Sequence, residues 1–257
     1  MQLRAVTTYL ARTLGSAAIS DSLAMVETTG YARLLLVGRG ENQLGTLDLG
    51  VQAPIVPQAN DPVIDTGAGR ALALQSTTAL PRVYAFSAYA DPARHVAINP
   101  SGVLGASIAV ATDSGALTGV VAIEVLEFAT GDIAAVARRG VAGLTLYALS
   151  DAGGMTQLGQ ISDGPKAYLA GISDIASLQL GADRLMLAAS ALENGLSSYR
   201  VTAAGAVEWI DSLGTQSGLA VNGPAQMQTV FMGGKTMLCW PQLYRPRFPW
   251  CASTRWG

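Results

Sequence analysis

The chain repeats itself with a period of 52 residues, and this repeat restricts the possible folds more than any other feature of the sequence. Its first sign is a series of five equally spaced glycines, Gly15, Gly67, Gly119, Gly171 and Gly223. An aliphatic residue follows the last four of them at the same distance, at Leu74, Leu126, Leu178 and Val230. In the first unit Leu23 and Met25 alternate near the equivalent point. Such a chain folds as an array in which each unit packs on its neighbours.

Each unit reads as four short β-strands separated by turns. In the fourth unit the expected strands are 176–180, 185–189, 196–201 and 207–210. In the third they are 125–128, 133–137, 144–149 and 157–161. The second unit has middle strands at 84–86 and 95–98, and the first at 33–37 and 44–49. Short apolar runs punctuated by Gly, Asp and Asn are typical of strands and turns.

We therefore predict an all-β fold, a β-propeller-like array of about four and a half four-stranded blades that is incomplete. The repeats occupy residues 1–235, with units starting near 15, 67, 119, 171 and 223. Radial repetition of small sheets leaves only short, protected strand edges. Helical periodicity is absent except over 3–14, a segment that we expect to be an outer strand closing the last blade. Pro54, Pro57 and Pro62 make the outer part of the first unit an edge strand or loop.

The repeat unit resembles that of lactonase-like (YVTN-type) β-propellers. The pattern Gly-Leu-Ser-x-Tyr-Arg-Val in the fourth unit, followed by a turn and a last strand, carries the resemblance, which spans roughly residues 15–235. Similar modules stand at the front of large secreted bacterial calcium-binding proteins of the RTX type. The resemblance implies a seven-bladed toroid that some members use as a lactone hydrolase. No catalytic residue can be transferred, and the calcium-binding nonapeptide repeat is absent from this sequence.

The last 22 residues, 236–257, break the pattern. They hold both cysteines, three of the four tryptophans, three prolines, three arginines and no acid, whereas the preceding part carries a net charge of −5. Cys239 and Cys251 suggest a disulfide or a metal pair at first, but we expect neither, because the whole tail departs from the repeat. Read one nucleotide earlier, codons for the tail can encode DYALLAATLSSSLSVVRVDALG, which resembles the middle of a fifth unit. A frameshift is one hypothesis, and an atypical capping tail is the alternative.

Composition excludes several classes of protein. Half of the residues are hydrophobic and 13% are charged, which argues against disorder. A net charge of −2 without Lys/Arg clusters predicts no nucleic-acid partner. No apolar stretch is long enough to span a membrane, and the N-terminus is not a good signal peptide. We expect export without an N-terminal signal, with a cytoplasmic location as the alternative. Nothing in the sequence specifies a ligand, a protein partner or an oligomeric state.

Few residues are candidates for chemistry. Asp21 and Asp174 share the string Ile-Ser-Asp just before the first strand of a unit, where two acids could bind a cation or polarise a water. They are the candidate metal ligands, although we favour a turn role in which each Asp accepts backbone hydrogen bonds. No cofactor motif is evident, and a divalent cation such as calcium is the one candidate. His95 is the only histidine, so a His-based triad is nearly excluded, and we expect an exposed or hydrogen-bonded strand-end residue.

Three functions remain open on these grounds. The first is a non-catalytic binding or structural module of a larger, secreted bacterial protein, which fits the regular repeat and the lack of a catalytic set. The second is a lactonase-type hydrolase acting at the central channel, which rests on the resemblance. The third is a truncated product without function of its own, whose unpaired strand edges would promote aggregation.

Overall fold

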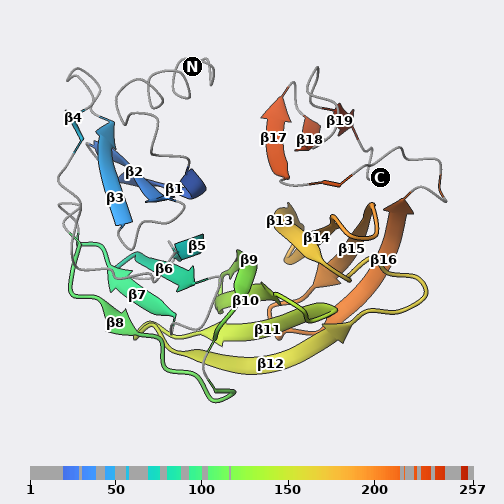
Figure 1. Ribbon diagram of the computed structural model, residues 1–257, viewed down its shortest axis with the longest axis horizontal. Helices are drawn as coiled ribbons and strands as arrows, with labels where there is room; N and C mark the ends of the chain where they lie inside the picture. The colour runs from blue at the N-terminus through green and yellow to red at the C-terminus, as the bar shows by residue number, and fades with distance from the viewer. Residues whose placement is uncertain are drawn as a thin grey trace. The chain divides into compact units, whose positions relative to one another are not determined.

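The computed structural model describes most of the chain from the second blade onward and the strands of the first. The described residues are 20–28, 31–38, 44–49, 56–57, 69–75, 80–87, 93–99, 104–115, 117–214, 217, 223–224, 227–232, 235–240 and 250–253. They are all-β, in small antiparallel sheets that follow one another along the chain (Figure 1). The chain divides into two compact units, residues 1–111 with 115–119, and residues 112–114 with 120–257. Among the described residues no helix is long and apolar enough to cross a membrane.

The first of these two compact units contains two four-stranded sheets. One has the order β1 (Ser20–Thr28), β2 (Tyr31–Gly38), β3 (Leu44–Leu49) and β4 (Val56–Pro57). The other has the order β5 (Gly69–Gln75), β6 (Arg82–Ser87), β7 (Arg94–Ala97) and β8 (Ile108–Ala109). Pro57 lies in the two-residue edge strand β4, as the sequence predicts, whereas Pro54 and Pro62 lie outside the described residues.

The second compact unit contains two more four-stranded sheets, which we call the third and fourth blades. The third has the strands β9 (Val120–Phe128), β10 (Gly131–Arg138), β11 (Gly143–Leu149) and β12 (Met155–Ser162). The fourth has β13 (Ile172–Leu180), β14 (Asp183–Ser190), β15 (Gly195–Val201) and β16 (Val207–Gly214). Each pairs its strands in sequence order, so each is an up-and-down meander. The predicted strands are present, and most extend beyond the predicted limits.

The repeated glycines have a conformational cause. Gly119, Gly171 and Gly223 all have positive φ, of 67°, 66° and 56°. Each stands just before or near the first strand of its sheet, where the chain enters a new unit. Only glycine adopts this left-handed conformation without strain, so the period marks the entry turn of each blade. Gly15 and Gly67 lie outside the described residues.

The third and fourth blades pack on each other through an apolar core. Strands β10 and β14 are buried along almost their whole length, which explains their continuous apolar sequence. The fourth strand β12 alternates between exposed and half-buried residues, as expected at a sheet edge. The core between the blades includes Leu126 and Ile133 from the third blade, and Met186 and Tyr199 from the fourth. Burial of this surface is the main force that holds neighbouring blades together.

A fifth sheet of three strands follows, with the order β17 (Gln228–Met232), β18 (Lys235–Trp240) and β19 (Trp250–Ser253). Part of the compositionally distinct tail therefore lies in β-strands, because β18 pairs with β17 and β19 pairs with β18. The described chain thus has four four-stranded sheets and one three-stranded sheet. The opening segment 3–14, which we predict to close the last blade, lies outside the described residues.

Candidate functional site

An acidic side chain lies within the apolar junction between the third and fourth blades. Glu124 is on β9, the first strand of its blade, flanked on the same face by Ala122 and Leu126 of the core. The hydroxyl of Ser177 on β13 donates a hydrogen bond of 2.7 Å to Oε1 of Glu124. This bond joins residues 53 positions apart and connects the first strands of two neighbouring blades.

The surroundings of Glu124 favour its protonated form. Burial raises its pKa from 4.5 to about 7, and the negative charge of Asp174 adds to this rise, while the hydrogen bond from Ser177 opposes it. Desolvation destabilises a carboxylate more than a neutral carboxyl, which explains the direction. At neutral pH this group therefore exists in both protonation states, as a proton donor or acceptor does.

Asp174, one of the two predicted metal ligands, lies at the start of β13. Its carboxylate accepts a hydrogen bond from the backbone N–H of Met227, next to β17. Burial raises the pKa of Asp174 to about 6, and backbone hydrogen bonds from Met227 and Ile175 oppose the rise. The side chain thus accepts backbone N–H groups, in line with the turn role favoured above, and fixes the entry to the fifth sheet.

Asp21 does not occupy the equivalent position in the first sheet. The pairing of β1 with β2 shifts between Ser20 and Ser22, so Asp21 is the extra residue of a bulge. In β13 the extra residue at the corresponding shift is Ser173, between Ile172 and Asp174. The bulge therefore falls on the aspartate of the Ile-Ser-Asp string in β1 and on the serine of the string in β13, so the two strings differ by one residue in their structural position. The side chain of Asp21 lies outside the described residues, and cation binding by this pair of aspartates stays a prediction.

His95 is buried in β7 between two arginines. Its Nδ1 lies 3.3 Å from a guanidinium nitrogen of Arg82, and its ring packs against Tyr84 with centroids 5.9 Å apart. Burial lowers its pKa, and the charges of Arg82 and Arg94 lower it further. A neutral imidazole that accepts a hydrogen bond from arginine fits the hydrogen-bonded alternative predicted above. Its burial, 2% exposed, rules out the exposed alternative.

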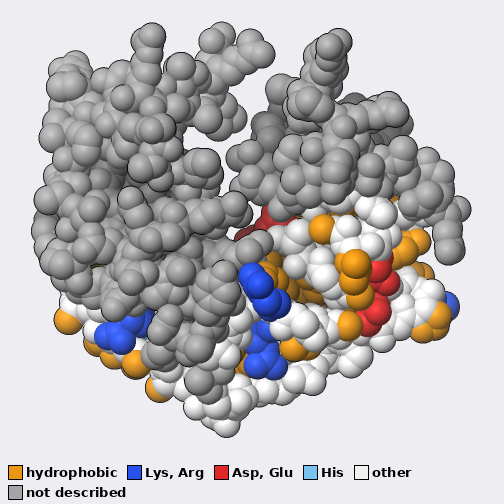
Figure 2. All heavy atoms as spheres, viewed as in Figure 1, with side chains coloured by type: hydrophobic (Ala, Val, Ile, Leu, Met, Phe, Trp, Pro, Cys, Tyr) orange, Lys and Arg blue, Asp and Glu red, His pale blue; other side chains and the backbone are white. Residues whose placement is uncertain are grey.

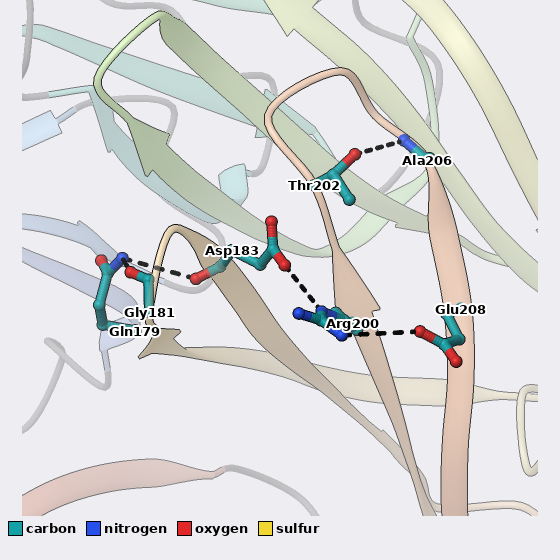
Figure 3. Close-up of polar contacts among 7 residues, drawn as sticks. All are labelled: Gln179, Gly181, Asp183, Arg200, Thr202, Ala206 and Glu208. Atoms are coloured by element: carbon teal, nitrogen blue, oxygen red, sulfur yellow. Dashed lines mark hydrogen bonds and ion pairs between the residues drawn. The ribbon is translucent and has the colours of Figure 1, made fainter.

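A solvent-exposed depression of about 370 Å³ lies on the fourth blade. Its lining residues come from the start of β14, the end of β15 and the following turn into β16, and are Asp183, Arg200, Thr202, Ala206, Val207 and Glu208. Arg200 lies between two acids (Figure 3). Its Nε donates to Asp183 at 2.7 Å, and a second guanidinium nitrogen is 4.0 Å from Glu208. The depression thus carries one guanidinium and two carboxylates, with Ala206 and Val207 beside them.

The third blade shows which parts of this depression belong to the repeat. The Thr202 hydroxyl accepts a hydrogen bond from the N–H of Ala206, and Ser150 does the same for Gly154 in the third blade. Thr202 is therefore a turn residue. The positions 52 residues before the charged trio hold Gly131, Ala148 and Thr156, which carry no charge. The third blade therefore shares the turn of this depression but not its three charges.

Among the described residues, neither the blade junction around Glu124 nor the depression around Arg200 contains a complete catalytic set. The depression has no nucleophile paired with a base, since its hydroxyl is used in the turn. No three His, Cys, Asp or Glu side chains come together as metal ligands within the described ranges. On the visible face, the described acidic and basic side chains form small groups separated by uncharged surface (Figure 2).

The sequence analysis did not identify Glu124 or Arg200 as a candidate site residue, although Arg200 lies in the repeat pattern Gly-Leu-Ser-x-Tyr-Arg-Val. A signal for Glu124 exists, because it interrupts the apolar stretch of β9 where the fourth unit has Ala176. Arg200 could have been found by aligning the third and fourth units and noting where charge replaces a small residue. Its partners Asp183 and Glu208 are brought to it by strand pairing, which a linear comparison does not give.

Comparison with known proteins identifies the fold only. No protein family and no curated protein matches the sequence. Solved structures do match. An endo-arabinase from Bacteroides thetaiotaomicron has a TM-score of 0.54 and 9% identity, over 94% of this chain and 96% of its own. The allergen Mala s 1 of Malassezia sympodialis has a TM-score of 0.54 and 14% identity, over 90% of this chain and 76% of its own.

An exo-β-1,3-galactanase from Phanerochaete chrysosporium has a TM-score of 0.55 and 9% identity, over 87% of this chain. The chain spans 56% of the length of that enzyme. Identities this low establish a shared architecture and carry no residue roles. Together with the four-stranded antiparallel sheets, these similarities establish that the chain has a β-propeller fold.

Proposed function

We propose that this chain is a non-catalytic β-propeller module of a larger protein, and that it binds a small, hydroxyl-rich ligand such as a sugar in the depression of the fourth blade. The Asp183–Arg200–Glu208 group carries the proposal, because these three charged side chains line a depression that is open to solvent. In contrast, Glu124 and Asp174 use their carboxyl groups in bonds between neighbouring sheets.

The chemistry of the depression suits hydroxyl groups. Carboxylates accept hydrogen bonds from hydroxyls and a guanidinium donates to them, so one ligand ring can contact both. The Arg200 and Glu208 side chains are 48% and 72% exposed, so their pairing is solvent-screened and easily exchanged for a ligand. The volume of about 370 Å³ lies at the lower end of the range for small-molecule pockets, roughly 300–1,000 Å³.

Saturation-transfer NMR of the full chain with methyl glycosides of arabinose, galactose and xylose tests this proposal. We expect transfer to at least one glycoside and its loss in Arg200→Gln. The matched control is Arg139→Gln, an exposed arginine outside the depression, which should retain transfer. Absence of transfer to all three glycosides, or equal transfer in both variants, would refute binding at this site.

A glycoside or lactone hydrolase is the second candidate function. The observation in its favour is the raised pKa of two carboxyl groups on neighbouring first strands, about 7 for Glu124 and about 6 for Asp174. Buried acids with raised pKa values can act as proton donors and acceptors near neutral pH. Solved structures with a similar fold include an endo-arabinase and an exo-β-1,3-galactanase. The lactonase alternative and the relation to secreted RTX-type proteins rest on the repeat resemblance alone.

Hydrolysis assays distinguish the two functions. Aryl arabinosides, galactosides and xylosides and simple lactones are incubated with the chain, with and without divalent cations. Under the binding proposal we expect no turnover above buffer. Turnover that is lost in Glu124→Gln or Asp174→Asn, with the folded state intact by circular dichroism, would establish the hydrolase instead. A dependence on calcium together with loss in Asp21→Asn would support the cation prediction for that residue.

A further inference from the structure

The two cysteines of the chain are direct partners in the fifth sheet. β18 and β19 pair antiparallel, with Cys239 opposite Cys251 and Trp240 opposite Trp250. Cys239 and Cys251 are the only cysteines among 257 residues, and this one ladder also holds two of the four tryptophans as a directly opposed pair. Residues opposed in an antiparallel pair share one face of the sheet, so both cysteines lie on the same face.

The register satisfies the main geometric requirement for a disulfide bond. Opposed residues of an antiparallel pair have Cα atoms about 4.5 to 5.5 Å apart, depending on the type of pair. Disulfides join cysteines with Cα atoms roughly 4.4 to 6.8 Å apart. A shift of the register by one residue would place the cysteines on opposite faces and prevent the bond.

The sequence alone led us to expect no disulfide here, but from this register we propose that Cys239 and Cys251 form an intramolecular disulfide bond that links β18 to β19. The bond closes a loop over residues 240–250, which contains Pro241, Pro246 and Pro249. By restricting the unfolded chain, the bond favours the paired state of the two strands. It connects the last strand of the fifth sheet covalently to a strand that pairs directly with β17.

Formation of the bond requires a small-molecule disulfide such as oxidised glutathione as the oxidant. One cysteine thiolate attacks a sulfur of this disulfide, forming a mixed disulfide and releasing one small-molecule thiol. The second cysteine thiolate then attacks the mixed disulfide, and the second small-molecule thiol leaves. The two cysteines lose two electrons and two protons in total, and the oxidant gains them. A stable bond would fit the extracellular location expected above, because disulfides persist in oxidising compartments.

Peptide mapping of the full chain tests the bond. The folded protein is equilibrated with oxidised and reduced glutathione, its remaining thiols are alkylated, and it is digested with trypsin. Cleavage after Lys235, Arg247 and Arg255 places the two cysteines on separate peptides, 236–247 and 248–255. We expect the two peptides to be linked in the unreduced digest and separate after reduction. The intact monomer should be lighter than the reduced chain by two hydrogen atoms.

A second measurement separates a bond set by the fold from chance oxidation. The measured quantity is the squared concentration of reduced glutathione divided by the concentration of oxidised glutathione at which half of the bond is reduced. We expect this value to be at least about tenfold higher for the folded chain than for the chain unfolded in guanidinium chloride. Cys239→Ser and Cys251→Ser are the controls, and each should leave one thiol that alkylates or takes up glutathione. The proposal would be overturned if both cysteines were alkylated, if both carried glutathione, or if the chains were linked as dimers. It would also be overturned if the bond were reduced equally easily in the folded and the unfolded chain.

Discussion

The carboxylate of Asp174 on β13 accepts a hydrogen bond from the backbone N–H of Met227, the residue just before β17. Two further bonds connect the fourth blade to the same stretch of main chain. The Ser173 hydroxyl donates to the carbonyl of Pro224, and the Asn194 side chain accepts the N–H of Gly223. Side chains of the fourth blade thus position the start of the fifth repeat.

This connection predicts that two substitutions of Asp174 differ in their effect on stability. Asp174→Ala leaves the N–H of Met227 without its acceptor, and should lower the free energy of unfolding by about 1–3 kcal/mol. Asp174→Asn keeps an acceptor oxygen and removes the charge. Urea unfolding measures both, and hydrogen exchange should show faster exchange in β17 of the alanine variant. Equal stability of Asp174→Ala and the parent chain would contradict a structural role for this bond.

The raised pKa of Asp174 adds a pH dependence to the comparison. A carboxyl whose pKa rises from 3.8 to about 6 on folding contributes stability that is present below pH 3.8 and is lost as the pH rises through 6. Asp174→Asn does not ionise and keeps its stability over this window. The free energy of unfolding of Asp174→Asn, relative to that of the parent chain, should therefore increase as the pH rises from 3.8 to 6.

The raised pKa of Glu124 leads to a second predicted effect of pH on stability, in a higher pH range. Its pKa rises from 4.5 to about 7 on folding, so the stability that its protonated form provides is lost as the pH rises through 7. Glu124→Gln should flatten the slope of stability against pH between 4.5 and 7, as measured by urea midpoints. Glu208→Gln is the control for removal of a carboxylate at the surface, since the side chain of Glu208 is 72% exposed. An unchanged slope in Glu124→Gln would show that burial of Glu124 has no energetic effect.

The sequence predicts the all-β repeat well because local signals and global fold agree. Turn residues and strand periodicity place most strands of the third and fourth blades, and the glycine period marks entry turns with positive φ at Gly119, Gly171 and Gly223. Strand ends are less predictable. The start of β13 at Ile172 contains a bulge, and the extra residue breaks the alternation of buried and exposed side chains that sequence patterns depend on.

The candidate sites were less predictable because they depend on contacts between distant residues. Arg200 meets Asp183 only after β14 and β15 pair, and Glu124 meets Ser177 only after two blades pack together. The pairing of Cys239 with Cys251 likewise requires the register of β18 and β19, whereas composition alone marks the tail as foreign to the repeat. Periodicity along the chain indicates where strands lie, but it does not specify which side chains they bring together.

The coding frame of the tail gives a further prediction. β18 begins at Lys235, at the point where the composition changes, and pairs directly with β17. Under the frameshift hypothesis, the coding DNA read one nucleotide earlier from this point continues the 52-residue repeat without an early stop codon. Sequencing the gene and its downstream region checks this. An early stop, or an alternative frame without the repeat, would leave the capping-tail alternative.

Tyr168, in the connection between β12 and β13, gives the last prediction. Its ring lies against Gly195 on β15, and a Cβ atom added to Gly195 would overlap the ring. A Cβ on Gly214 of β16 would lie 2.7 Å from Tyr168 Cζ. Gly195→Ala should therefore destabilise the chain by about 1–3 kcal/mol, because a packed aromatic ring must move. Thermal or urea unfolding measures the loss.

Gly159→Ala on β12 is the matched control. It is also a strand glycine, and an added Cβ there would meet no atom within 4 Å. Its stability should be unchanged or higher, since alanine reduces the freedom of the unfolded chain. In a Tyr168→Ala background the cost of Gly195→Ala should largely disappear, which a double-mutant cycle measures as a coupling energy. If the cost persists without the ring, the requirement for glycine at 195 lies in the backbone of β15 and not in its contact with Tyr168.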